Sequence, residues 1–131
     1  MDWTIEFDKA IEQYLPDLEV LQDEPMSRHT TFRIGGPAKR MAFPSSREQL
    51  VLLMSFAKDY GANPLVIGNG SNLLVPDEGL DRLVIDTSAN LNRVERGSGN
   101  TVLADAGAAL ARTADLACKL GLAGLEFAHG I

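Results

Sequence analysis

The sequence feature that most constrains the fold is a glycine-rich loop that follows a short apolar segment. Pro64–Ile67 is apolar throughout, which is typical of a strand covered on both faces of a sheet. It runs directly into Gly68-Asn69-Gly70-Ser71-Asn72. The two glycines allow the backbone to turn sharply and bring main-chain N–H groups close to an anion, and the polar residues add side-chain donors. The loop therefore suits a diphosphate, and the alternative is a polar turn between two strands.

Two common phosphate-binding motifs do not match this loop. In the dinucleotide fingerprint of the Rossmann fold a third glycine follows and a helix begins, but here Leu73 stands at that position and no helix is expected after it. A P-loop would require Gly-Lys-Ser or Gly-Lys-Thr, which the sequence lacks. The loop therefore indicates a different class of nucleotide site.

The remaining patterns predict an α+β fold. Ser46 can cap the backbone amide of Gln49 and Gln49 can return the bond, so a helix begins there and ends at Gly61. The inner stripe of this helix is expected at Leu50, Leu53, Met54 and Ala57. We also expect helices at 4–15 and 109–120, strands at 19–22, 40–43, 64–67 and 83–85, and a hairpin of 93–96 with 101–104. Mixed hairpin and crossover connections favour α+β over a regularly alternating parallel sheet.

Composition excludes several function classes. Twelve Lys and Arg residues against eighteen Asp and Glu residues give a net charge of −6, which argues against a general nucleic-acid binder. No apolar run approaches the roughly 20 residues of a membrane span, and the first residues do not resemble a signal peptide. The single Cys118 cannot form an internal disulfide, and we expect it to be a small buried side chain. We expect a cytoplasmic protein without a metal site.

Four blocks of the sequence, in order and spacing, resemble the UDP-N-acetylenolpyruvoylglucosamine reductase family. Ser27–Ala38, which contains Thr-Phe-Arg-Ile-Gly-Gly, is similar to the opening signature of the family. Gly68–Val75 is similar to its FAD diphosphate loop. The other two matching blocks are Asp105–Ala108 and Gly121–Phe127.

The resemblance covers residues 20–131. It implies an FAD-binding module of the PCMH/VAO type, built from two small α+β subdomains and preceded by an N-terminal helical extension over residues 1–19. It also implies that the chain stops before the rest of the module and before the substrate domain.

The resemblance also implies the cofactor contacts. The diphosphate would lie on the glycine loop, so the expected contacts there are Ile67, Gly68, Asn69, Gly70, Ser71, Asn72 and Leu73. Gly130 and Ile131 resemble the start of a second FAD loop and are also expected to contact FAD. Arg33 would either lie near the flavin or brace the loop, and the alternative is a solvated surface residue. His29 and His129 are expected to be structural, as are Glu126 and Phe127 at the turn into the second loop.

The activity implied by the resemblance is a reduction in two steps. NADPH passes a hydride to FAD, and the reduced flavin passes it to the enolpyruvyl group of a UDP-sugar. The serine that supplies the proton, and the arginine and glutamate that assist it, would lie beyond residue 131, so no residue of this chain is expected to be catalytic. We expect a truncated, inactive portion of the enzyme that binds FAD weakly or not at all and self-associates through exposed apolar surface.

Two alternatives stay open. One is the FAD-binding part of another PCMH-type oxidoreductase, including an oxidase with covalently held flavin. Such an oxidase needs a His or Cys at the flavin, and the candidates are His29, His129 and Cys118, none of which lies in the glycine loop. The other alternative is a non-enzymatic nucleotide-binding or interaction module that is complete as it stands.

Overall fold

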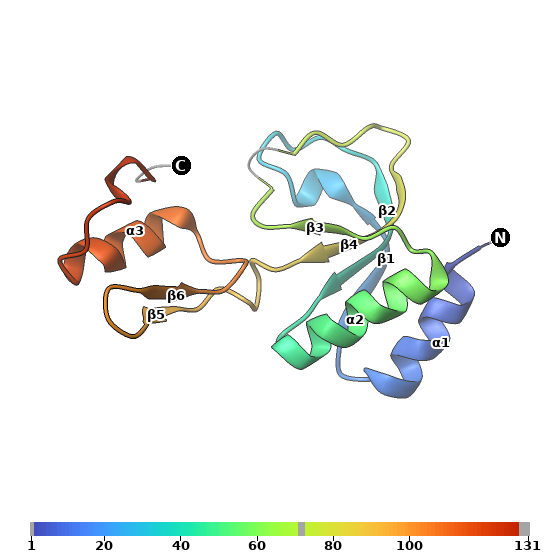
Figure 1. Ribbon diagram of the computed structural model, residues 1–131. Helices are drawn as coiled ribbons and strands as arrows, with labels where there is room; N and C mark the ends of the chain where they lie inside the picture. Colours follow the sequence, from blue (N-terminus) through green and yellow to red (C-terminus); the bar gives the residue numbers. More distant parts are fainter. Residues whose placement is uncertain (1, 71–72, 129–131) are drawn as a thin grey trace.

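A four-stranded mixed sheet with two helices on one face forms the larger part of the molecule (Figure 1). The computed structural model describes residues 2–70 and 73–128. The strands lie in the order β1-β2-β4-β3, with β1 antiparallel to β2 and β4 parallel to both of its neighbours. The elements of this part are α1 (Thr4–Tyr14), β1 (Glu19–Pro25), β2 (Pro37–Phe43), α2 (Arg47–Tyr60), β3 (Leu65–Ile67) and β4 (Leu80–Asp86).

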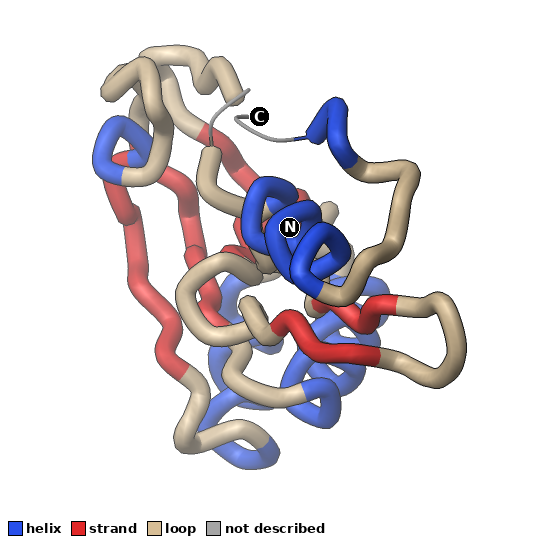
Figure 2. The backbone as a smooth tube through the Cα atoms, turned by 90° about the vertical axis from the view of Figure 1, so that its left-hand side faces the viewer, coloured by secondary structure: helices blue, strands red, loops and turns tan. Residues whose placement is uncertain are grey.

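A smaller part follows β4 and lies to one side of the sheet in Figure 1. In Figure 2, which is turned by 90°, this part faces the viewer. It consists of an antiparallel hairpin, β5 (Val94–Arg96) and β6 (Val102–Ala104), and helix α3 (Leu110–Lys119). Two short 3-10 turns complete the structure, η1 (Met26–Arg28) before β2 and η2 (Glu126–Ala128) after α3. The α+β class and the predicted hairpin are confirmed.

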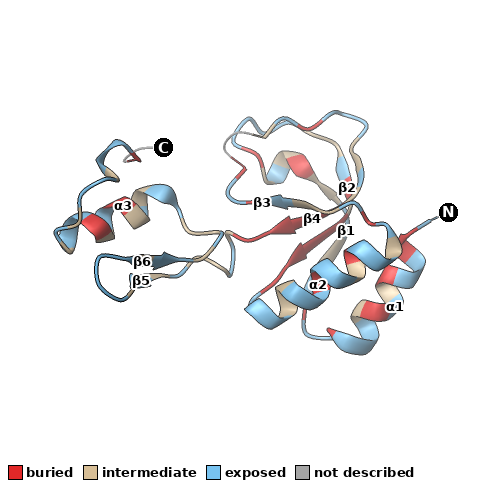
Figure 3. Cartoon of the chain, viewed as in Figure 1, coloured by how far each residue is buried: buried red, intermediate tan, exposed pale blue. Residues whose placement is uncertain are grey.

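The two faces of the large sheet pack into separate apolar clusters. The second halves of β2 and β4 are buried (Figure 3). Because neighbouring residues of a strand point to opposite faces, Leu83 and Ile85 face the helices while Val84 faces away from them. On the helix side they meet Phe7 of α1 and Leu53 of α2, both fully buried. On the other side the cluster includes Met26, Met41, Phe43, Ile67 and Val75.

Helix α1 is fixed to the sheet by polar contacts as well. Arg40 of β2 donates from Nε and Nη2 to the two carboxylate oxygens of Asp8, at 2.9 and 2.7 Å. This hydrogen-bonded pair raises the pKa of Arg40 above its ordinary value. Trp3 donates from Nε1 to Asp81 at the start of β4, at 3.0 Å. Polar contacts therefore add to the apolar packing that holds α1 on the large sheet.

Helix α2 begins and ends as predicted, with two differences of detail. Ser46 Oγ accepts the backbone N–H of Gln49 at 3.1 Å, and Gly61 ends the helix with φ of +71°. The Gln49 side chain, however, accepts the N–H of Ser45 at 2.8 Å rather than that of Ser46. Met54 is 38% exposed, so its place in the inner stripe was wrong. It directly follows Leu53, and one helical step turns it away from the sheet.

Two further burial predictions were wrong. Val66 is 49% exposed because β3 lies at the edge of the sheet, whereas a strand covered on both faces was expected. Cys118 is exposed, because α3 turns Ala114 and Ala117 inward and leaves Cys118 on another face. No helix within the described ranges combines the length and apolar character needed to cross a membrane.

Candidate functional site

The glycine loop leaves β3 at the edge where the parallel strands end. Ile67 and Asp86 are register partners and are the last residues of β3 and β4. Ligands of open α/β sheets commonly bind beyond the carboxyl ends of parallel strands. Gly68 and Asn69, both exposed, follow one strand end, and Thr87 and Ser88 follow the other.

Two cavities meet at the carboxyl ends of β3 and β4. The larger, of about 880 Å³, is lined by Asn69, Asp86, Ser88 and residues of the segment 27–33. The smaller, of about 380 Å³, is lined by Gly68, Asn92, Arg112 and the segment 106–110. Asn69 and Ser88 line both cavities, so the glycine loop stands between them.

The larger cavity has a polar wall with two guanidinium groups, those of Arg28 and Arg33. His29 is held by Glu24, whose Oε2 lies 2.9 Å from the ring Nε2. The carboxylate of Asp86 is engaged internally, because its Oδ1 accepts the N–H and the hydroxyl of Ser88, both at 2.7 Å. The arrangement suits a ligand with anionic and hydrogen-bonding groups.

The smaller cavity has a wall of small residues, because the segment from Ala106 to Ala109 carries no side chain larger than a methyl group. This segment leads into the first turn of α3, where Ala109 supplies no side-chain cap. The first turn of a helix carries unsatisfied N–H groups and a partial positive charge. Arg112 donates from Nη1 to the carbonyl of Asn92 at 2.8 Å and so fixes α3 to the connecting segment.

The two loop glycines occupy different surroundings. Around Gly68 an added Cβ would meet no described atom within 4 Å. Gly70 is buried with φ of +74°, and a Cβ there would overlap the carbonyl oxygen of His29. The carbonyl of Gly70 in turn accepts the N–H of Thr31 at 3.2 Å. Gly68 therefore leaves room for an approaching ligand, whereas Gly70 allows the loop to pack against the segment that lines the larger cavity.

The structure brings most of the described predicted contacts to this edge. Asn69 lies between the cavities, and Arg33, with φ of +55°, lines the larger one. Ile67 and Leu73 belong to the apolar cluster on the face away from the helices, Ile67 buried and Leu73 partly buried. The predicted contacts outside the described residues are Ser71, Asn72, Gly130 and Ile131, and His129 lies outside them as well.

Sequence reasoning missed the polar residues at the end of β4 and directly after it. Asp86 and Ser88 line the larger cavity, and Thr87 holds the start of the glycine loop. The available signal was a polar triplet directly after the buried strand 83–85, the same arrangement that drew attention to the loop after 64–67. His29 was expected to be structural; its carbonyl contacts Gly70, and the residue also lines the larger cavity.

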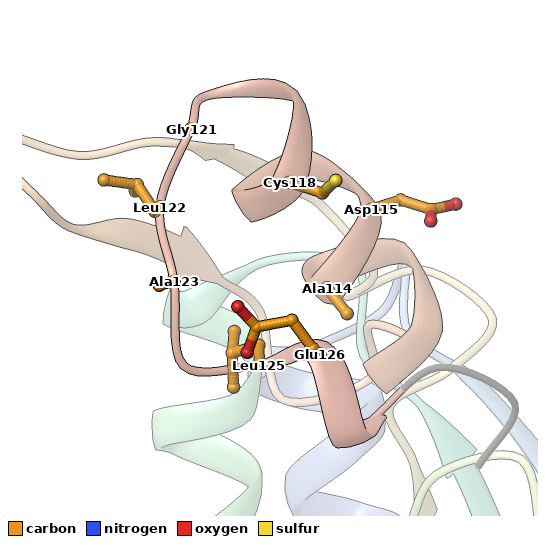
Figure 4. Close-up of a pocket in the computed structure, with 8 residues that line it drawn as sticks. All are labelled: Ala114, Asp115, Cys118, Gly121, Leu122, Ala123, Leu125 and Glu126. Atoms are coloured by element: carbon orange, nitrogen blue, oxygen red, sulfur yellow. The ribbon is translucent and has the colours of Figure 1, made fainter.

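A third cavity, of about 530 Å³, lies between α3 and the segment that follows it (Figure 4). Its lining is mostly apolar, with Ala114, Cys118 and Leu122 among its residues, and it shares none of them with the other two cavities. Hydrogen bonds from its own backbone N–H and from that of Gly124, which donates at 3.0 Å, lower the pKa of Glu126. No group of three or more His, Cys, Asp or Glu residues within 2–70 and 73–128 could hold a metal ion.

A family model described as an FAD binding domain matches residues 38–131. The chain belongs to this family of FAD-binding domains. Its cofactor is therefore FAD. The match includes the glycine loop and the whole lining of the smaller cavity, and begins after the segment 27–33. The boundary expected at residue 20 stays a prediction.

The curated relatives are reductases of similar sequence. The chain is 48% identical over 114 residues to the UDP-N-acetylenolpyruvoylglucosamine reductase of Moorella thermoacetica, covering 87% of this chain and 37% of that protein. It is 44% identical over 113 residues to the enzyme of the same name from Bacillus subtilis, covering 86% and 37%. The chain thus spans about two fifths of the length of the curated relatives it matches.

Two solved structures share the fold. The UDP-N-acetylenolpyruvylglucosamine reductase of Thermus caldophilus is 31% identical with a TM-score of 0.57, covering 87% of this chain and 38% of that one. A cholesterol oxidase from Brevibacterium sterolicum is 17% identical with a TM-score of 0.58, covering 82% and 21%, and shows the fold alone. The α+β architecture of the PCMH/VAO type is confirmed.

The observed site fits the family's cofactor. A dinucleotide needs donors for its diphosphate and room on both sides of it. The loop offers an open backbone at Gly68 with a cavity on each side of Asn69. Small residues at 106–109 and the polar segment 27–33 form the opposite walls.

Proposed function

We propose that this chain forms the FAD-binding part of an NADPH-dependent reductase that converts UDP-N-acetylglucosamine enolpyruvate to UDP-N-acetylmuramate. The supporting observation is the 48% identity over 114 residues to a UDP-N-acetylenolpyruvoylglucosamine reductase. The function would belong to peptidoglycan precursor synthesis in the cytoplasm, and so to cell wall formation, cell shape and division.

In this proposal the chain holds the cofactor and contributes no catalytic side chain. FAD supplies the hydride chemistry when bound, while protein groups bind and orient it. Gly68 and Asn69 would present the loop backbone to the diphosphate, and Arg33 would face the ligand across the larger cavity. Gly70 is proposed as a contact beside them. The contacts proposed at Ile67, Leu73, Ser71, Asn72, Gly130 and Ile131 complete the set.

The proposed division of the chain has an N-terminal helical extension over 1–19 and an FAD-binding domain over 20–131. Packing of Phe7 into the core of the sheet supports an extension that is fixed to the domain rather than free of it. Self-association through exposed apolar side chains also stays a proposal. Val51 and Leu52 of α2 are exposed and offer one such surface.

The test is an FAD titration of the chain, followed by flavin fluorescence. We expect saturable binding, weakened about tenfold or more in Gly68→Asn, because a side chain at Gly68 would occupy the space through which the diphosphate approaches. The matched control is Gly99→Asn in the distant hairpin turn, where φ is +60°, no described atom lies within 4 Å and Asn tolerates the conformation.

The control variant should bind FAD as the wild type does. Equal affinities of the wild type and Gly68→Asn would contradict the proposed site. So would the absence of saturable binding both to this chain and to the longer reductase chain proposed here.

A further inference from the structure

Thr87 is buried behind the glycine loop and holds the carbonyl group from which the loop starts. Its side chain and backbone are 1% exposed. Its backbone N–H and its hydroxyl both donate to the carbonyl oxygen of Ile67, each at 3.0 Å. One carbonyl therefore accepts two hydrogen bonds from a single residue of the neighbouring strand end.

This pair of bonds sets the orientation of the next amide. The peptide unit is planar and trans, so the Ile67 carbonyl and the Gly68 N–H point in opposite directions. With the carbonyl held toward Thr87, the Gly68 N–H is directed away from Thr87. Gly68 is exposed and lines the smaller cavity, with open space around its Cα.

Thr87 is in turn fixed by the smaller part of the molecule. Its carbonyl accepts the N–H of Leu91 at 2.9 Å, and the carbonyl of Leu91 accepts the N–H of Gly107 at 2.8 Å. Gly107 lies so close that a Cβ there would overlap the carbonyl oxygen of Thr87. Gly107 also belongs to the wall of the smaller cavity. Thr87 thus connects the two walls that face each other across the cavity.

We infer that Thr87 is a positioning residue for the cofactor: its hydroxyl fixes the Ile67–Gly68 peptide so that the Gly68 amide donates to the diphosphate of FAD. The inference rests on the proposed FAD site and deepens it, because Thr87 acts on the cofactor through the loop backbone rather than by touching it. A threonine with a merely structural role would stabilise the fold without affecting affinity for the anion.

The test compares FAD affinity of three variants with the wild type. Thr87→Val keeps the shape and removes the hydroxyl, and we expect its Kd for FAD to rise about fivefold to tenfold. Thr87→Ser keeps the hydroxyl, and its Kd should stay within about twofold of the wild type. The control is Thr4→Val. Thr4, the first residue of α1, is also buried, at 5% exposed, and its hydroxyl donates to Asp2 at 2.6 Å. The Thr4→Val variant should be less stable than the wild type and should bind FAD with the same affinity.

A second measurement follows the backbone amide of Gly68 by nuclear magnetic resonance. In the wild type, saturating FAD should shift the backbone amide resonance of Gly68, and the shift should be smaller in Thr87→Val. If Thr87→Val does not fold, Thr87→Cys against Thr87→Ser isolates the hydroxyl, because the two side chains have nearly the same shape and the thiol is the weaker donor. We expect the Cys variant to bind FAD about threefold more weakly than the Ser variant.

The outcomes separate the inference from the function on which it rests. If neither this chain nor the longer reductase chain proposed above binds FAD, the proposed function fails and the inference fails with it. If the wild type binds FAD while Thr87→Val binds equally well, or Ser and Cys at position 87 give equal affinities, the inference alone is overturned. It is also overturned if Thr4→Val weakens binding as much as Thr87→Val does.

Discussion

At Gly70, the backbone carbonyl of His29 occupies the space that any Cβ would need. The φ of +74° adds strain for any other residue. We therefore expect Gly70→Ala to lower the free energy of unfolding by about 2–4 kcal/mol, since neither backbone can move aside cheaply. Urea unfolding followed by circular dichroism measures the change.

Gly68→Ala is the matched control for this substitution, two positions away in the same loop. Its Cβ would meet no described atom within 4 Å, so the free energy of unfolding should change by no more than about 0.5 kcal/mol. Equal destabilisation of the two variants would show that the loop does not pack against His29 as described.

In the sequence the two glycines look equivalent, and their different surroundings could not be predicted from it. A glycine-rich turn after an apolar strand identifies the loop, because that pattern is local. The contact that distinguishes Gly70 comes from His29, and the bond that orients Gly68 comes from Thr87. Both partners are remote in sequence, so no local pattern could have revealed them.

At the scale of elements, the ion pair of Arg40 with Asp8 fixes α1 to the middle of the sheet. Two hydrogen bonds form between the guanidinium and the carboxylate, and Arg40 is buried while Asp8 is partly exposed. We expect Arg40→Ala to lower the free energy of unfolding by about 1–3 kcal/mol, because it removes a paired charge and its packing and leaves Asp8 without that partner. Thermal unfolding measures the change.

The control for Arg40→Ala lies on α1, the helix to which Asp8 belongs. Lys9 and Glu6 form a bridge of 3.5 Å with both side chains well exposed, and pairs of this kind contribute little. Lys9→Ala should therefore change stability by less than about 0.5 kcal/mol. A larger loss for Lys9→Ala than for Arg40→Ala would contradict the role of Arg40.

The helices and strands could be predicted from the sequence, but which of their faces are exposed could not. Helical spacing, Ser46 and Gly61 located α2 because caps and periodicity are written in consecutive residues. The exposure of Val66 depends on β3 being the edge strand, which follows from the strand order and not from the sequence of β3. Cys118 is exposed because α3 turns Ala114 and Ala117 inward, and the helical spacing of this segment did not by itself decide which face would be covered.

At the scale of the whole molecule, the two parts differ in how much they bury. The large sheet has an apolar cluster on each face. From β5 onward the buried residues among those described are three alanines, Ala114, Ala117 and Ala128. Local stability follows buried apolar contact, so without FAD we expect amides of β5, β6 and α3 to exchange with deuterium faster than those of β2 and β4.

Cofactor binding should reduce this difference, because the smaller cavity has one wall from each part: Gly68 on the sheet side, and residues 106–110 and Arg112 on the other. A ligand that binds the closed arrangement and not the opened one stabilises it by mass action, by about 2.7 kcal/mol at a concentration 100 times its Kd. Exchange in β5, β6 and α3 should then slow by up to about 100-fold, while the core amides of β2 and β4 change much less.

The measurement is hydrogen–deuterium exchange with and without FAD, with α1 as an internal reference distant from the loop (Figure 1). Slowing confined to the large sheet would mean that FAD does not contact the second wall, and the smaller cavity would then not be part of its site.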